Sequence, residues 1–277
     1  MDVEVRGDGA QVRGGGAGPA VETTGLVRRF GDFTAVDSLD LRVERGQFFG
    51  FLGPNGAGKS TTIKMLTGLL APTAGGARVL GRDVAAEALE VKRRIGVVPE
   101  DLNLFERLTG AEMLSFTGRM YGLGREDTAL RSRELLELME LDAEPRRLVV
   151  EYSHGMKKKL SLACALIHRP EMLFLDEPFE GVDAVASRTL KDLLSRLTAR
   201  GLTVFLTSHV LEIVERLCTH IAIISAGRLA AAGPLEELRR GISVGGEEGA
   251  ALSLEDYFIS VVGGTREAGA DALGWLG

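Results

Sequence analysis

Residues 53–61 read Gly-Pro-Asn-Gly-Ala-Gly-Lys-Ser-Thr, and this stretch decides the fold more than any other. It matches the phosphate-loop pattern G-x-x-x-x-G-K-[S/T], follows an apolar run over 47–52 and opens an amphipathic stretch that reaches Leu70. Glycines let backbone N–H groups turn toward phosphate oxygens, and the following helix adds the positive end of its dipole. We therefore expect a nucleoside triphosphate to be bound by Gly53, Pro54, Asn55, Gly56, Ala57, Gly58, Lys59, Ser60 and Thr61.

Individual residues of two motifs can be given chemical roles. Lys59 is expected to reach the β- and γ-phosphates, and the Ser60 hydroxyl to ligate Mg²⁺. Further on, the apolar run 172–175 ends in two adjacent carboxylates, Asp176 and Glu177. Open α/β sheets present their chemistry at the carboxyl ends of their strands. Asp176 is expected to hold Mg²⁺ directly or through water, and Glu177 to act as the general base toward the attacking water.

Composition limits the class of protein. The chain has 277 residues, a net charge of −6 and a pI near 5.4, which argues against a nucleic-acid partner because such partners require a basic face. The sequence contains neither a secretory signal pattern nor an apolar run of the length that spans a membrane. Cys164 and Cys218 stand alone in apolar segments, which predicts reduced core thiols in a cytosolic protein.

The order of apolar runs and helical patterns along the chain predicts a mixed, largely parallel α/β sheet. Residues 1–20 are rich in glycine and predict a disordered tail, and alternation over 33–43 predicts a half-buried strand. Between residues 100 and 147 the strand pattern is replaced by a helical insertion, with a capping box at Thr109–Glu112 and a helix over 125–141. A Gly-rich passage over 241–251 precedes a helix capped by Ser253, which either packs on its own core or stabilises a dimer. Short apolar runs at 48–52, 94–98, 172–175, 203–206 and 221–224 predict the remaining strands.

Two local patterns each allow two interpretations. His209 follows the apolar run 203–207, so it is either an ordinary surface or core histidine or a residue that contacts the γ-phosphate at the edge of the sheet. Lys157–Lys159 open a helical stretch, and we interpret these lysines as a solvated first turn rather than a binding patch.

The segment Tyr152-Ser-His-Gly-Met156 completes a set of five motifs, and with it the chain resembles the ATP-binding cassette family over about residues 21–240. In that family residues 53–61 correspond to Walker A, 173–177 to Walker B, 181–183 to the D-loop and His209 to the switch histidine. The resemblance implies an α/β P-loop NTPase fold: a RecA-like, mostly parallel core, an antiparallel β subdomain and a helical subdomain over about 100–170. Residues 241–277 would follow as a linker and a C-terminal helix.

The resemblance also implies a dimer that hydrolyses ATP with Mg²⁺. Ser153 and the Gly155 amide would face the γ-phosphate bound to the opposite subunit, and Asp183 would couple the two sites. The opposite subunit would be a second copy of the chain or a related ATPase. Phe30 stands where the family has its adenine-stacking aromatic, although a plain core phenylalanine is an open alternative.

Three residues depart from the family pattern. His154 replaces the first glycine of the signature and Met156 its final glutamine, but Ser153 and Gly155 keep the phosphate contacts. Glu100 stands where the family has a glutamine that touches Mg²⁺ and the attacking water. A carboxylate there adds negative charge near the acidic pair, so we expect slow basal hydrolysis until a partner repositions the loop.

The resemblance places the chain at the cytoplasmic face of the membrane, beside a separate permease. Leu102, Leu104 and Phe105 would form the docking surface, unless they tuck beneath the helical insertion. The signature, the loop at 99–100 and the closing helix are similar to those of bacterial export ATPases, often of drug or antibiotic efflux. The alternatives are an importer subunit, a soluble cassette ATPase acting on ribosomes or nucleic acid, and a regulatory subunit that binds ATP without hydrolysing it.

Overall fold

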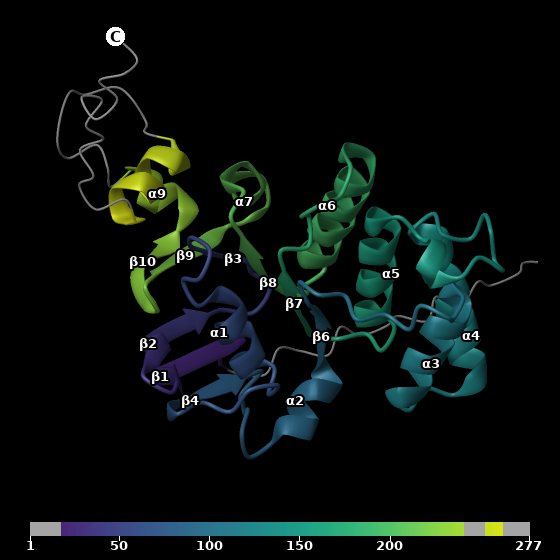
Figure 1. Ribbon diagram of the computed structural model, residues 1–277, viewed down its shortest axis with the longest axis horizontal. Coiled ribbons are helices and arrows are strands. Elements are labelled where there is room, and N and C mark those ends of the chain that lie inside the picture. The colour runs from purple at the N-terminus through teal and green to yellow at the C-terminus, as the bar shows by residue number, and fades with distance from the viewer. Residues whose placement is uncertain (1–17, 241–252, 263–277) are drawn as a thin grey trace, which may run out of the picture.

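A computed structural model describes residues 18–240 and 253–262 of the chain (Figure 1). The strands are β1 (Val21–Phe30), β2 (Phe33–Val43), β3 (Phe48–Leu52), β4 (Ala74–Val79), β5 (Arg82–Asp83), β6 (Ile95–Val98), β7 (Met172–Asp176), β8 (Thr203–Ser208), β9 (His220–Ser225) and β10 (Arg228–Pro234). The helices are α1 (Lys59–Leu66), α2 (Ala88–Arg94), α3 (Gly110–Met120), α4 (Arg125–Leu138), the 3₁₀ turn η1 (Val149–Glu151), α5 (His154–Leu166), α6 (Ala184–Ala199), α7 (Leu211–Leu217), α8 (Leu235–Arg240) and α9 (Leu254–Val262). The expected Gly-rich tail lies almost wholly outside the described residues, and the Gly-rich passage over 241–251 lies wholly outside them.

The larger sheet has six strands in the order β10-β9-β3-β8-β7-β6. Its neighbouring strands are parallel except for β10, which runs antiparallel to β9. In the register, Leu52 pairs with Ser208 and Asp176 with Thr207, so strands β3, β7 and β8 end at the same edge. The prediction of a mixed, largely parallel sheet is confirmed, and the phosphate loop, the acidic pair and His209 follow strands that end together.

The parallel strands β3, β7 and β8 of this sheet are buried on both faces. Side chains alternate between the faces, and the ring of Phe205 lies with its centroid 5.4–5.5 Å from those of Phe49, Phe51 and Phe174 on the face that also holds α1. The opposite face packs against α5, α6 and α7 through Phe48, Leu173 and Leu206, among others. Parallel strands that are buried on both faces are apolar along their whole length, which explains why short continuous apolar runs identified them.

The smaller sheet is antiparallel, in the order β2-β1-β4-β5, and covers α1 from the other side. Strand β2 confirms the alternation seen over 33–43, but β1 and β4 had no such signal. Register shifts interrupt the pairing of β1 with β2, one of them around Gly25, which has a φ of +52°. Thr23 is also buried and donates its hydroxyl to the Leu39 carbonyl at 2.7 Å. These irregularities break the two-residue period that sequence reasoning depends on.

A helical lobe lies between β6 and β7 and contains α3, α4, η1 and α5 (Figure 1). The predicted capping box is present: the Glu112 amide donates to Thr109 Oγ1 at 3.2 Å, and the Thr109 amide donates to Glu112 Oε2 at 2.8 Å. Helix α4 begins at the expected residue and ends at Leu138, three residues early. Figure 1 shows the lobe beyond the β6 edge of the sheet, at the opposite end of the molecule from α9.

Helix α9 packs on the body of its own chain. Ser253 caps it, accepting the Asp256 amide at 3.2 Å, and the Leu254 side chain is fully buried. The Leu254 amide also donates to Glu215 Oε1 on α7 at 3.2 Å. The first of the two expectations for this helix, packing on its own core, is therefore confirmed. Across residues 18–240 and 253–262 we find no helix with the length and apolar character that a membrane crossing requires.

Candidate active site

The phosphate loop lies between β3 and α1 and depends on glycine at two closely packed positions. A Cβ on Gly53 would lie 2.4 Å from the Ile224 carbonyl oxygen. A Cβ on Gly58 would lie 2.5 Å from the Ala35 carbonyl oxygen, and Gly58 has a φ of +108° that L-residues rarely adopt. The loop thus lies directly against β2 and β9, and its shape cannot be kept with larger side chains at these positions.

The first turn of α1 faces the loop with free amide groups. Gly58 is the N-cap residue and has no side chain to cap the helix, and the first turn contains no acidic residue. Lys59 is buried and curls back, donating from Nζ to the carbonyl oxygens of Gly53 at 2.7 Å and Pro54 at 3.3 Å. Uncapped amides at a helix N-terminus beside a lysine ammonium form a fitting cradle for phosphate.

Asp176 ends β7 in a buried position. Its Oδ1 accepts a 2.6 Å hydrogen bond from the hydroxyl of Thr207 on β8, and the same hydroxyl accepts the Glu177 amide at 3.1 Å. Thr207 therefore holds the two carboxylate residues in place from the neighbouring strand. Sequence reasoning missed Thr207, although a polar residue within a buried apolar strand was a usable signal.

Glu177 lies at the centre of the site. Its Oε2 is 3.1 Å from His209 Nδ1, and its Oε1 is 3.8 Å from Lys59 Nζ. Oε1 is buried and accepts no hydrogen bond within the described part of the chain. Its backbone has a φ of +46°, a strained conformation for a non-glycine residue, of the kind found at functional sites. Of the two interpretations of His209, the structure favours the one in which it belongs to the site.

Glu100 follows β6 and lies beside α1, where Ser60 Oγ donates to Glu100 Oε2 at 3.4 Å. Ser60, Glu100 and Asp176 supply only oxygen donors, the type that Mg²⁺ prefers. In the described residues, no group of three or more acidic, histidine or cysteine side chains forms a site that could hold a metal by itself. The donor set fits Mg²⁺, which is typically held by one or two carboxylates together with substrate phosphates.

Phe30 ends β1 with its side chain in solvent. It is 46% exposed, and the Arg28 guanidinium lies 4.5 Å from the ring centroid. The alternative of a plain core phenylalanine is therefore wrong. An exposed ring remains available to stack on a base.

The turn at Ser153–Gly155 forms the N-terminus of α5. Ser153 is the N-cap residue and its hydroxyl accepts the Met156 amide at 3.2 Å. His154 turns toward the loop after β7, with Nε2 3.2 Å from the Glu180 carbonyl oxygen. Gly155 is packed so closely that a Cβ would lie 3.3 Å from Asp183 Oδ2. The His154 side chain thus contacts the segment between β7 and α6.

Asp183 has a structural role at the start of α6. Its Oδ1 accepts the amides of Val185 at 3.0 Å and Ala186 at 2.9 Å, which caps the helix. These backbone hydrogen bonds hold the pKa of the Asp183 carboxyl below its usual value. Its other oxygen faces Gly155, so the carboxylate connects the start of α6 with the turn before α5.

The three lysines at the start of α5 are not a solvated turn. Lys157 pairs with Glu106 at 2.9 Å on the surface, but Lys158 and Lys159 are buried. Lys159 Nζ pairs with Glu140 Oε2 at 2.8 Å. The expectation was wrong because successive residues of a helix point about 100° apart, so adjacent lysines meet different surroundings.

Lys158 points inward, beneath the loops that follow β6 and β7. Its Nζ donates to the Glu177 carbonyl oxygen at 3.1 Å and makes a longer contact of 3.5 Å with the Glu100 carbonyl oxygen. Burial lowers the pKa of the Lys158 ammonium, and nearby carboxylates act in the opposite direction. Those carboxylates belong to Glu180, Asp176, Glu100 and Glu177.

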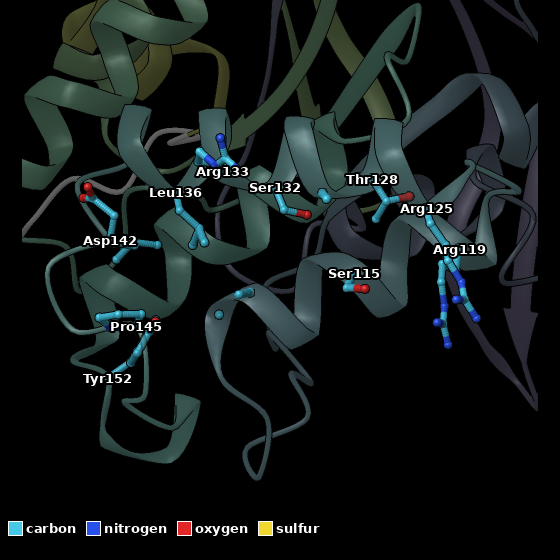
Figure 2. Close-up of a pocket in the computed structure, with 14 residues that line it drawn as sticks. Ser115, Arg119, Arg125, Thr128, Ser132, Arg133, Leu136, Asp142, Pro145 and Tyr152 are labelled. Carbon is cyan, nitrogen blue, oxygen red and sulfur yellow. The ribbon is translucent and has the colours of Figure 1, made fainter.

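A cavity of about 660 Å³ lies elsewhere, in the helical lobe. Figure 2 shows it between α3 and α4, with Arg119 and Arg125 at one end and Pro145 and Tyr152 at the other. None of the phosphate-loop residues lines it. It is therefore separate from the group of residues around Glu177.

Comparison with known proteins agrees with this geometry. The ABC transporter family matches over residues 36–180. The daunorubicin resistance ATP-binding protein DrrA3 of Streptomyces coeruleorubidus is 43% identical over 223 residues, 80% of this chain and 71% of that protein. The Nod factor export ATP-binding protein I of Cupriavidus metallidurans is 42% identical over 209 residues, 76% of this chain and 69% of that protein. A solved structure of the ATP-binding subunit of an ABC transporter has a TM-score of 0.79 and 30% identity, over 87% of this chain and 99% of that chain.

Proposed function

Because the chain belongs to the ABC transporter family and is one of its ATP-binding ATPases, we propose that two copies close around two ATP molecules and drive export through a separate membrane permease. The division of the site within one chain supports this proposal. Lys59, Glu177 and His209 gather at the edge of the sheet. Within residues 18–240, no hydrogen bond or ion pair joins the turn at Ser153–Gly155 to the phosphate loop. A triphosphate on the loop is thus left with an open side that the turn of a second copy can cover.

Hydrolysis within this site would use Glu177 as the general base. Its Oε1, which accepts no hydrogen bond in the described part of the chain, can accept a proton from water, while His209 fixes the other oxygen. Lys59 would leave the loop carbonyls to hold the β- and γ-phosphates. Ser60, Asp176 and Glu100 would hold Mg²⁺, which neutralises charge that develops on the transferred phosphoryl group.

The carboxylate of Glu100 would slow basal turnover. It adds a negative charge next to Ser60, close to the acidic pair. We expect Glu100→Gln to raise the basal rate of ATP hydrolysis. A slower Glu100→Gln variant would contradict this role.

The turn before α5 would complete the site of the partner. Ser153 Oγ and the amides at the N-terminus of α5 would form an anion-binding end, and a side chain at Gly155 would crowd Asp183 Oδ2. Asp183 lies against Gly155 and caps α6, so a movement of the turn would be transmitted to the segment that follows Glu177.

The permease would dock beside the loop that follows Glu100. Phe105 is 53% exposed and meets Phe116 edge-on, with ring centroids 5.2 Å apart. Leu102 and Leu104 are partly buried against the core, so they support the surface more than they form it. Such an exposed aromatic pair suits an apolar helix of a partner. Phe105→Glu should weaken association with the permease, and unchanged association would contradict the assignment.

Export, rather than import, is supported by relatives whose names describe drug resistance and Nod factor export. The deciding experiment reconstitutes the chain in lipid vesicles with a candidate permease chosen from the neighbouring genes. With ATP supplied at the face of the membrane that carries the chain, we expect substrate to be exported away from that face. Glu177→Gln should abolish this ATP-dependent transport. Stimulation of the ATPase by ribosomes or DNA, and not by the permease, would overturn the proposal.

A further inference from the structure

Lys158 is a buried lysine that contacts both loops of the site. It is 2% exposed, comes from the second turn of α5 and ends at the carbonyl oxygens of Glu177 and Glu100. Glu177 and Glu100 follow two neighbouring strands, β7 and β6. One ammonium group therefore contacts the backbone of both segments that carry the carboxylates of the site.

The contacts of Lys158 are directed at the backbone and not at a charge. In the described part of the chain no carboxylate oxygen lies within 4.0 Å of its Nζ, because it forms none of the ion pairs found there. A buried ammonium requires hydrogen-bond acceptors, and here carbonyl oxygens meet that requirement. The Glu177 carbonyl oxygen also accepts the Glu180 amide at 3.3 Å, so Lys158 adds a second donor to it, from α5.

Lys158 also connects these loops to the turn at Ser153–Gly155. Ser153 is the N-cap residue of α5 and Lys158 lies five positions after it in the same helix, so the turn and Lys158 belong to one rigid element. The N-terminus of α5 would present amide groups to an anion. Between one and two turns later, Lys158 donates a hydrogen bond to the Glu177 carbonyl oxygen. A displacement of the turn would therefore displace Lys158 with it.

We infer that Lys158 is a positioning residue that holds the backbone of Glu177 and Glu100 to α5. As a result, the turn at Ser153–Gly155, which meets the nucleotide of the partner, moves together with the carboxylates of its own site. The coupling between two sites rests on the proposed dimer. The holding of the two loops is a property of one chain and can be tested without a dimer.

The chain offers a matched control in Lys159. Lys159 is buried on the same helix, but its Nζ pairs with Glu140 Oε2 at 2.8 Å and touches neither loop. Lys158→Met and Lys159→Met each remove one buried ammonium from α5. A difference between the two variants therefore reports on what Lys158 contacts and not on the loss of a buried charge as such.

The first measurement is amide hydrogen exchange in the nucleotide-free chain. In Lys158→Met we expect protection over residues 98–105 and 176–183 to fall about tenfold, with no such fall in Lys159→Met. Lys158→Gln keeps an N–H donor without the charge and should recover part of the protection. If Lys158→Met does not fold, protection over the same residues is compared between Lys158→Gln and Lys159→Met. Lower protection in Lys158→Gln than in Lys159→Met would support the inference, and equal protection would overturn it.

The second measurement is steady-state ATP hydrolysis by the same variants. Lys158→Met should lower kcat about tenfold or more while KM for ATP changes less than about threefold, because the loops are displaced but the phosphate loop is intact. Unchanged protection in Lys158→Met would overturn the inference, whatever its rate. So would lost protection with unchanged kcat, a Lys159→Met variant that behaves like Lys158→Met, or a glutamine variant no better than methionine. Failure of export or of dimer formation leaves the exchange result unaffected, so the two proposals fail separately.

Discussion

Replacing Thr207 with valine tests how the acidic pair is held. Thr207 is fully buried on β8, and its hydroxyl makes two hydrogen bonds: it donates to Asp176 Oδ1 at 2.6 Å and accepts the Glu177 amide at 3.1 Å. Valine has the same shape but can make neither bond. Asp176 would lose the only hydrogen-bond donor found for its side chain in the described residues, and the Glu177 amide would lose its acceptor.

The expected loss of stability follows from these two bonds. A hydrogen bond to a charged group contributes about 1.5–3 kcal/mol, and a buried donor left unsatisfied costs about 1–3 kcal/mol. Thr207→Val should therefore lower the free energy of unfolding by about 2.5–6 kcal/mol. Thr207→Ser keeps the hydroxyl and removes one buried methyl group, so it should cost about 1 kcal/mol.

Thr62 provides the matched control. It is equally buried, but its hydroxyl donates only to the Gly58 carbonyl at 2.9 Å, which also accepts the amide of Thr62 itself. Thr62→Val should therefore cost less than about 1 kcal/mol. Urea unfolding of the nucleotide-free chain, followed by circular dichroism, measures all three variants. Equal losses for Thr207→Val and Thr62→Val, or for the valine and serine variants of Thr207, would refute the reasoning.

Three further predictions concern single groups. Burial lowers the pKa of His168 below its usual 6.5. As the pH falls below 6.5 the unfolded chain therefore binds this proton first, and the free energy of unfolding decreases. His168→Gln should make the urea midpoint depend less on pH in this range, and an unchanged dependence would contradict the prediction. Burial raises the pKa of the Cys164 thiol to about 11 and also raises the pKa of the Cys218 thiol. At about pH 8 neither thiol should therefore react with Ellman's reagent until the chain is unfolded. Rapid labelling of the folded chain would contradict this prediction. Phe30→Ala should weaken ATP binding about fivefold by calorimetry, because ring stacking contributes about 1 kcal/mol, whereas Phe30→Tyr should bind normally; equal affinity of the alanine variant would remove Phe30 from the site.

The sequence was sufficient for the parallel core and for most of the site. Strands buried on both faces are apolar along their length, so β3, β7 and β8 were visible as short runs, and the residues that follow them met at one edge as expected. The phosphate loop could be recognised because its function depends on consecutive residues. Ser60 and Glu100 lie 40 residues apart, yet the structure brings their side chains to 3.4 Å.

Other parts of the fold depend on information that is not local. Strand β1 carries bulges and a buried threonine, which removed its alternating pattern. The burial of Lys158 is decided by what lies under α5, and three identical neighbours in the sequence gave no sign that one of them differs. Asp183 was expected to act across an interface, but its local role as the N-cap of α6 became visible only with the hydrogen bonds to Val185 and Ala186.

The idea that one chain supplies only part of each ATP site can be tested with a single mass measurement. The Glu177→Gln variant should bind Mg-ATP without hydrolysing it, so a closed pair would accumulate. With Mg-ATP, we expect light scattering coupled to size exclusion to report twice the mass of one chain for Glu177→Gln. For the double variant Glu177→Gln, Ser153→Glu, we expect the mass of one chain. A Glu177→Gln chain that binds Mg-ATP and remains monomeric, alone and with its permease, would contradict the shared site.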